Sequence, residues 1–170
     1  SNVFVSLMRS VSGTGRGFGS PARTQILTLC TIWPETMNLL TVETFNVGLE
    51  TFIDSCPDTV DNAVIFEDNG ETGYLYAIEK KTGEELKILD AVNIYDVARV
   101  TDKEIPSEIK IFWTDDFERV GLVINDYCHA IMDFKNKVGL CRTGFPEASQ
   151  TWPNGRHELT DKDVDSFFNS

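Results

Sequence analysis

Hydrophobic and polar residues alternate in several short segments between residues 63 and 142. Alternation with a period of two puts successive side chains on opposite faces of an extended strand. Turn signals such as Asn69-Gly70 and Asp115-Asp116 separate the segments at fairly even spacing, which is typical of antiparallel β proteins. The expected strands cover residues 63–67, 74–79, 86–95, 108–114, 120–124, 127–134 and 138–142.

The segment from residue 38 to residue 52 fits two patterns. Apolar residues at alternate positions fit a strand, whereas Leu39, Val42, Phe45 and Leu49 also fit a helical stripe. Gly48 and several threonines disfavour a helix, so extended structure is the prediction for this segment.

One short helix is expected near the C-terminus. Thr160 and Asp163 have the spacing of a capping box, and the apolar residues Val164, Phe167 and Phe168 follow within two turns. The phenylalanine side of this helix is expected to pack on the sheet. The whole pattern predicts a mainly β fold, α+β at most: an antiparallel meander, sandwich or partly open barrel of about seven to nine strands.

Residues 1–36 differ in composition from the rest of the chain. Residues 10–21 are rich in glycine and serine, and the glycines at 13, 15, 17 and 19 do not have the spacing of a phosphate-binding loop. We therefore predict that residues 1–36 are a flexible or peripheral N-terminal extension, and that residues 37–170 form a single β-rich domain.

The charge is strongly negative and unevenly distributed. The chain contains 27 acidic and 15 basic residues, for a net charge of −12. Residues 1–36 carry +2, which leaves −14 for residues 37–170. Such a surface repels nucleic acid phosphates and anionic membranes and attracts basic proteins or cations. An acidic surface also promotes solubility, which is the simpler explanation for the same charge.

No membrane or export segment is predicted. The longest apolar run is far shorter than the roughly 20 residues that span a bilayer, and no secretory cleavage pattern follows it. The cysteines Cys30, Cys56, Cys128 and Cys141 show no CxxC spacing, so reduced thiols and a cytoplasmic location are expected.

The hairpin at Asn69-Gly70 concentrates acidic side chains. A two-residue type I′ loop, which Asn-Gly favours, would place Asp68 opposite Glu71, at a cost of up to ~1 kcal/mol. A cation, an arginine, a basic partner or a turn that separates the two would offset this repulsion. Arg142 is the arginine that we expect to pair with Glu67, Asp68 or Glu71, because a guanidinium group can bind a carboxylate with two hydrogen bonds.

His129 and Cys141 are the residues that most resemble catalytic groups. His129 is a candidate general base, although a single histidine on a strand is more often a structural hydrogen bonder. Cys141 precedes Arg142, yet strand parity separates their side chains, so a buried structural thiol is expected. The histidine and cysteine spacings fit no zinc site, and no catalytic residue, metal or cofactor is predicted. The predicted polar cluster, for binding or for structure, is Glu67, Asp68, Glu71, Tyr74, His129 and Arg142.

Three blocks of sequence carry a family resemblance. They are FEDNGETGYLYA at 66–77, ILDAVNIY at 88–95 and CRTGFP at 141–146. From about Val47 to the C-terminus, the chain resembles a family of small bacterial proteins known only as a domain of unknown function. The resemblance implies a bacterial, cytoplasmic, β-rich protein and supplies no catalytic residue.

Three functions are compatible with these features. The first is a non-enzymatic protein-binding module for a basic partner; by analogy, an immunity-type inhibitor of a nucleic-acid-cleaving toxin is one such module. The second is an enzyme or small-ligand binder in which the acidic hairpin, His129 and Arg142 share one pocket. The third is a structural domain of a larger complex. Nucleic acid and membrane partners are not expected, and the sequence leaves the oligomeric state open.

Overall fold

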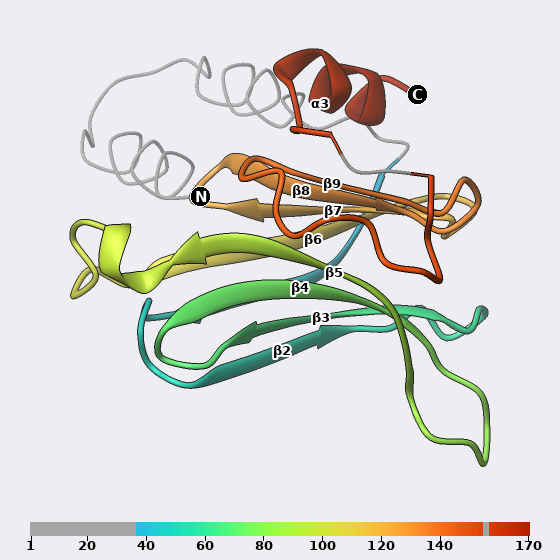
Figure 1. Cartoon of the computed structure of the whole chain (residues 1–170), viewed down its shortest axis with the longest axis horizontal. Coiled ribbons are helices and arrows are strands. Elements are labelled where there is room, and N and C mark those ends of the chain that lie inside the picture. The colour runs from blue at the N-terminus through green and yellow to red at the C-terminus, as the bar shows by residue number, and fades with distance from the viewer. Residues whose placement is uncertain (1–36, 155–156) are drawn as a thin grey trace, which may run out of the picture. The chain divides into compact units, whose positions relative to one another are not determined.

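The computed structural model describes residues 37–154 and 157–170, and their strands form two antiparallel sheets (Figure 1). The five-stranded sheet has the order β1-β6-β7-β8-β9. Its strands are β1 (Met37–Phe45), β6 (Ser107–Thr114), β7 (Arg119–Ile124), β8 (Tyr127–Asp133) and β9 (Val138–Cys141). The predicted N-terminal extension, residues 1–36, lies outside the described residues.

The four-stranded sheet has the order β2-β3-β4-β5. Its strands are β2 (Thr51–Ser55), β3 (Asn62–Asp68), β4 (Thr72–Glu79) and β5 (Lys87–Asp96). A short 3-10 helix, η2 (Val97–Arg99), follows β5. Each strand pairs with its neighbour in antiparallel orientation. The two sheets pack face to face, which confirms the predicted mainly β fold in its sandwich form.

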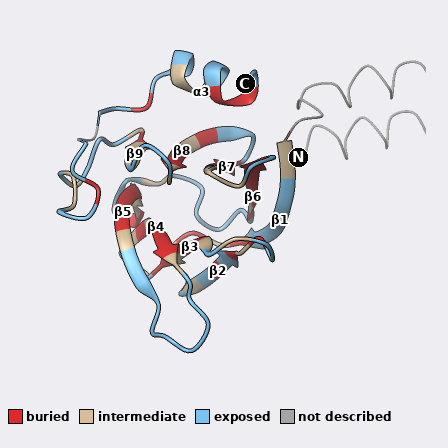
Figure 2. Cartoon of the chain, turned by 90° about the vertical axis from the view of Figure 1, so that its right-hand side faces the viewer, coloured by how far each residue is buried: buried red, intermediate tan, exposed pale blue. Residues whose placement is uncertain are grey.

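The core lies between the two sheets, and strands of both sheets carry buried residues (Figure 2). The alternation of side chains along a strand directs every second one into this core. Phe66 and Leu75 pair across β3 and β4, and Ile111 and Leu122 pair across β6 and β7; all four side chains are fully buried. Trp113 is also fully buried, and its indole nitrogen donates a hydrogen bond to Ser55 Oγ of the other sheet at 2.9 Å. This bond satisfies the polar atom of a large core side chain.

The predicted C-terminal helix is α3 (Asp161–Phe168), and it covers the outer face of the five-stranded sheet (Figure 1). Its capping box is formed as predicted: Thr160 and Asp163 bond to each other's backbone N–H groups. Phe168 packs edge-on against Phe112 of β6, with ring centroids 5.6 Å apart. A Cβ at Gly121 of β7 would lie 2.6 Å from the Phe167 ring, so the absence of a side chain there lets the helix approach the sheet.

The outer face of the four-stranded sheet is different. In the part of the chain that the structure describes, no helix or strand covers it (Figure 1). A small apolar cluster of Ala63, Ile65 and Ile78 lies on this face, with Tyr76 and Cys56 packed against it. One sandwich face is therefore covered by α3, while the other presents its side chains outward.

Candidate functional site

The predicted polar residues divide between the two sheets. Glu67 and Asp68 end β3, Glu71 lies in the following turn, and Tyr74 lies on β4, all in the four-stranded sheet. His129 lies on β8 and Arg142 follows β9, in the five-stranded sheet. The two groups make separate sets of contacts, and none of the hydrogen bonds or ion pairs described below joins one group to the other.

The turn between β3 and β4 is wider than the two-residue loop predicted from Asn69-Gly70. Asp68 lies opposite Gly73 and Glu67 lies opposite Tyr74, so the predicted pairing of Asp68 with Glu71 is wrong. The Asn69 side-chain oxygen accepts hydrogen bonds from the backbone N–H groups of Glu71 and Thr72, at 3.0 and 2.9 Å. These bonds stabilise the wider turn. The turn itself thus separates the two carboxylates.

Asp68 is a buried hydrogen-bond acceptor with 1% of its surface exposed. Its carboxylate accepts bonds from Gly48 N at 2.8 Å, Gly70 N at 2.8 Å and the Tyr95 hydroxyl at 2.7 Å. Burial, followed by the bond to Asp68, raises the pKa of Tyr95 well above its usual range. The carboxylate connects the β1–β2 turn, the β3–β4 turn and β5, which indicates a structural role.

Glu67 points outward into a cluster of aromatic side chains. Its Oε2 accepts a hydrogen bond from the Tyr76 hydroxyl at 3.0 Å. Burial, and then this bond, raise the pKa of Tyr76 to about 12. Tyr74 stacks on Tyr76 with ring centroids 6.1 Å apart, and Phe52 on β2 lies opposite Glu67. Carboxylate and ring faces therefore lie side by side on the uncovered face.

Arg142 pairs with α3 and not with the hairpin carboxylates, so the predicted pairing with Glu67, Asp68 or Glu71 is wrong. Its Nη2 lies 2.9 Å from Asp161 Oδ1, and its Nη1 donates to Leu159 O at 3.1 Å. Its Nε donates to Cys128 O at 3.0 Å, and its guanidinium carbon lies 4.5 Å from the centre of the Tyr127 ring. These contacts attach the start of α3 to β8.

His129 occupies a β-bulge. Leu122 pairs with Ala130 and the next residue, Val123, pairs with Cys128, so His129 is the extra residue on β8. The bulge reverses the side-chain parity, and Cys128 therefore does not share the core face of Ala130 and Met132 as strict alternation predicts. Burial, followed by the Arg142 charge, lowers the pKa of His129 to about 4. Such an imidazole is a weak base at neutral pH.

This shift predicts a loss of stability in mild acid. Below its ordinary pKa of 6.5 the unfolded imidazole binds a proton, whereas the folded one stays neutral down to about 4. The free energy of unfolding should fall as the pH is lowered from about 7 to 5, and His129→Gln should reduce this slope. Urea unfolding of both proteins across this pH range measures the difference. Equal slopes for both would contradict a half-buried His129 that stays neutral.

The thiols and the second histidine show no catalytic arrangement. Cys56, Cys128 and Cys141 are free thiols, while Cys30 lies outside the described residues. Burial raises the pKa of Cys128 to about 12, which opposes formation of the nucleophilic thiolate. Cys141 is fully buried, in agreement with the structural thiol predicted.

The side chain of His157 is 62% exposed, and its Nε2 lies 3.8 Å from Asp163 Oδ2. Within residues 37–154 and 157–170, no three acidic, histidine or cysteine side chains are grouped as a metal site requires.

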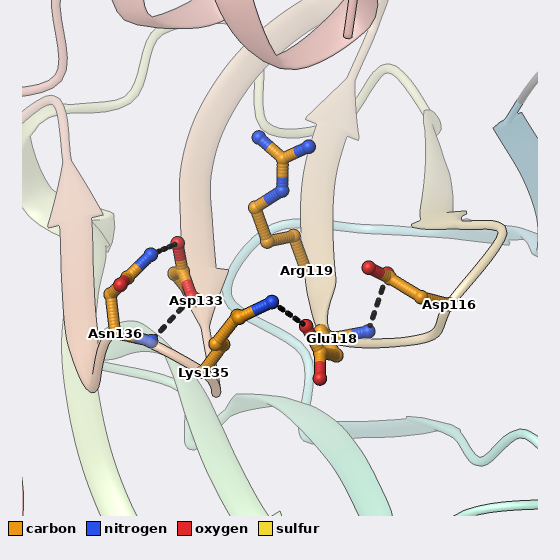
Figure 3. Close-up of a pocket in the computed structure, with 6 residues that line it drawn as sticks. All are labelled: Asp116, Glu118, Arg119, Asp133, Lys135 and Asn136. Carbon is orange, nitrogen blue, oxygen red and sulfur yellow. Dashed lines mark hydrogen bonds and ion pairs between the residues drawn. The ribbon is translucent and has the colours of Figure 1, made fainter.

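A polar pocket of about 310 Å³ lies where the β6–β7 and β8–β9 turns meet (Figure 3). Several of its polar groups bind one another: Lys135 Nζ lies 3.3 Å from Glu118, and Asn136 donates to Asp133 through its backbone and its side chain. The Arg119 side chain is directed away from Lys135 and Glu118 and donates a hydrogen bond to Ser170 Oγ at 2.8 Å. The residues that line this pocket include no cysteine, serine or histidine that could pair as nucleophile and base.

Sequence reasoning did not identify several residues of these clusters. Tyr76 and Phe52 share the outward parity of Glu67 and could have been found by extending the alternation across the hairpin. Tyr95 and Asp161 could not, because their contacts with Asp68 and Arg142 join residues that are remote in sequence.

The fold and its contacts define a β-sandwich without a catalytic constellation among the described residues. Residues 45–168 match the family described as "Uncharacterized protein conserved in bacteria" (DUF2251), and the chain belongs to this family. The resemblance seen in the sequence is therefore confirmed. The chain is also 31% identical over 105 residues to an uncharacterized protein of Haemophilus influenzae, and the match covers 62% of this chain and 65% of the relative. No solved structure matches it.

No helix in the described part of the chain combines the length and the apolar character needed to cross a bilayer. The cytoplasmic location stays a prediction.

Proposed function

We propose that this protein is a non-enzymatic binding module that recognises a basic protein partner through its negatively charged surface. The observation that carries the proposal is the charge of residues 37–79, which form β1 to β4. This segment contains no lysine, arginine or histidine. Its carboxylates are Glu43, Glu50, Asp54, Asp58, Asp61, Glu67, Asp68, Glu71 and Glu79.

The placement of these carboxylates supports the proposal. All of them except the buried Asp68 are exposed or half-buried. A surface of one sign steers an oppositely charged protein during diffusion and disfavours partners of the same sign. Nucleic acids and anionic lipids have the wrong charge for it. The partner class that fits this surface is a basic protein.

An immunity-type inhibitor is one specific form of this function. A toxin that cleaves nucleic acid has a basic surface for its substrate, and an acidic inhibitor can cover that surface by charge and shape alone. The inhibitor needs no catalytic residue of its own. This version of the proposal requires that the basic partner be such a nuclease.

Capture of partners at two salt concentrations tests the proposal. The immobilised chain should retain basic proteins at roughly 0.05 M salt, and retention should fall about tenfold or more at roughly 0.5 M, because exposed charges are screened over a shorter distance. Retained proteins that are neutral or acidic, or that ignore the salt concentration, would contradict the proposal.

Two variants with matched charge locate the effect. Glu43→Gln, Glu50→Gln and Glu71→Gln together remove charges from the cation-free segment. Glu84→Gln, Glu85→Gln and Glu104→Gln remove as many charges elsewhere on the exposed surface. The first variant should lose more of the salt-sensitive binding than the second. Equal losses would show that net charge alone, and not this segment, governs retention.

A further inference from the structure

The register of the four-stranded sheet places its outward side chains in rows across β2, β3 and β4. Phe52, Glu67 and Tyr74 form one row, because Glu67 is the direct partner of both other residues. The next row joins Asp54, Ile65 and Tyr76 by the same rule. We call these six residues the outer-face patch. It contains aromatic, aliphatic and acidic side chains and no cation.

The outer-face patch exposes aromatic surface that no described element covers. Phe52 is 65% exposed on the edge strand β2. The corresponding face of the other sheet has Phe167 and Phe168 of α3 packed on it. Exposed aromatic side chains grouped on one face of a monomer are typical of surfaces that bind another protein.

The patch is also held in a fixed arrangement. The Tyr76 hydroxyl donates to Glu67 Oε2 at 3.0 Å, and the Tyr74 and Tyr76 rings are stacked with an interplanar angle of 23°. The Tyr76 ring packs on the buried cluster of Ala63, Ile65 and Ile78. Side chains that are already ordered lose little entropy when a partner binds.

Adjacent carboxylates and aromatic rings suit one basic side chain in particular. Arginine presents a planar guanidinium group that stacks on a ring while its N–H groups bind carboxylate oxygens, whereas the lysine ammonium is compact and strongly hydrated. The chain contains such an arrangement itself, because Arg142 lies over Tyr127 and also binds Asp161. In the outer-face patch, Tyr74, Glu67 and Asp54 offer the same chemistry outward.

We propose that the outer-face patch is the docking surface for an arginine-bearing segment of the basic partner protein. The inference rests on the proposed function and extends it, because it names the contact surface and the side chain that is recognised. Tyr74 and Phe52 supply ring faces, and the carboxylates of Glu67 and Asp54 supply the counter-charge. The full negative charge of residues 37–79 attracts the partner, and the patch selects arginine.

A short peptide that alternates arginine with valine is the probe for this surface. Its lysine and glutamate counterparts serve as comparisons. The full chain should bind the arginine peptide more tightly than the lysine peptide, and it should not bind the glutamate peptide. On binding, amide NMR signals of β3 and β4 should shift, and those of β7 and β8 should not. Shifts confined to another surface would overturn the inference.

Variants on the patch and matched variants off it make the test specific. Phe52→Ala and Glu67→Gln should each weaken binding of the arginine peptide by about tenfold. The controls are Ile105→Ala, at an apolar position with 59% exposure, and Glu84→Gln, an equal loss of exposed charge outside residues 37–79; both should keep most of the affinity. Because Phe52 and Ile105 are exposed, neither truncation should unfold the protein.

The outcomes separate this inference from the proposed function. If basic proteins are captured with salt sensitivity but Glu67→Gln and Glu84→Gln weaken peptide binding equally, the docking surface is wrong and the function stands. Equal binding of the arginine and lysine peptides overturns the selection of arginine. A dimer that Phe52→Ala abolishes would show that a second copy of this chain occupies the patch, which also overturns the inference. If no basic protein is captured at low salt, the proposed function itself fails.

Discussion

Replacing Asp68 with alanine should lower the free energy of unfolding by about 3 kcal/mol or more. The carboxylate accepts hydrogen bonds from Gly48 N, Gly70 N and the Tyr95 hydroxyl, and it is 1% exposed. Alanine leaves these buried donors without their acceptor, and each unsatisfied donor costs on the order of 1–3 kcal/mol unless water reaches it. Urea unfolding followed by tryptophan fluorescence measures the loss.

Milder variants give an expected order of effects. Tyr95→Phe removes one donor and keeps both backbone bonds, so a loss of about 1 kcal/mol is expected. Asp68→Asn should fall between the two, because its amide nitrogen cannot accept a bond from a backbone N–H. Glu71→Gln, exposed in the same turn, is the control and should change stability by less than about 0.5 kcal/mol. An Asp68→Ala protein as stable as this control would show that the three bonds contribute nothing.

The fold class follows from features that the sequence displays openly. Alternation with a period of two and regular turn signals led to the correct strands in the β3–β9 region, and Thr160 with Asp163 marked the beginning of α3. Residues 38–52 were harder, since a helical stripe competed with the strand pattern. The structure places two strands there, β1 and β2, with Gly48 at a positive φ of 87° in the turn between them.

The hairpin shows how a wrong register can leave the fold prediction intact. The two-residue loop placed Phe66 opposite Gly73, whereas its partner is Leu75. The pairing therefore differs by two residues, and a shift of two keeps every side chain on the same face of the sheet. The wrong register thus left the prediction of a mainly β fold unaffected, while the predicted pairing of Asp68 with Glu71 was wrong.

The bulge at His129 had the opposite effect. One extra residue in β8 reverses the parity before it, so strict alternation would assign Cys128 to the core face of Ala130 and Met132, where it does not lie. Period-two reasoning cannot detect a bulge that no glycine marks. The predicted partner of Arg142 was wrong for a related reason. Which carboxylate binds Arg142 depends on how α3 packs on the sheet, and the acidic sequence offers many alternatives.

Replacing Arg142 with alanine should lower the free energy of unfolding by about 2–3 kcal/mol, mainly through lost bonds to backbone carbonyls. Nε and Nη1 satisfy the carbonyl groups of Cys128 and Leu159, and the side chain is only 18% exposed. Asp161, in contrast, is 88% exposed, and the exposed half of an ion pair contributes little. Asp161→Asn should therefore cost less than about 1 kcal/mol.

A conservative variant separates charge from geometry at the same position. Arg142→Lys keeps the positive charge but cannot donate from a planar fork to both carbonyls and stack on Tyr127, so it should recover less than half of the lost stability. Urea unfolding gives the energies, and hydrogen exchange of the α3 amides shows whether the helix detaches first. If Arg142→Lys matched the wild type, or if Asp161→Asn were as damaging as Arg142→Ala, the ion pair would be the dominant contact. In that case the helix would be held by charge, and its attachment would weaken with salt; the carbonyl bonds predict an attachment that is nearly independent of salt.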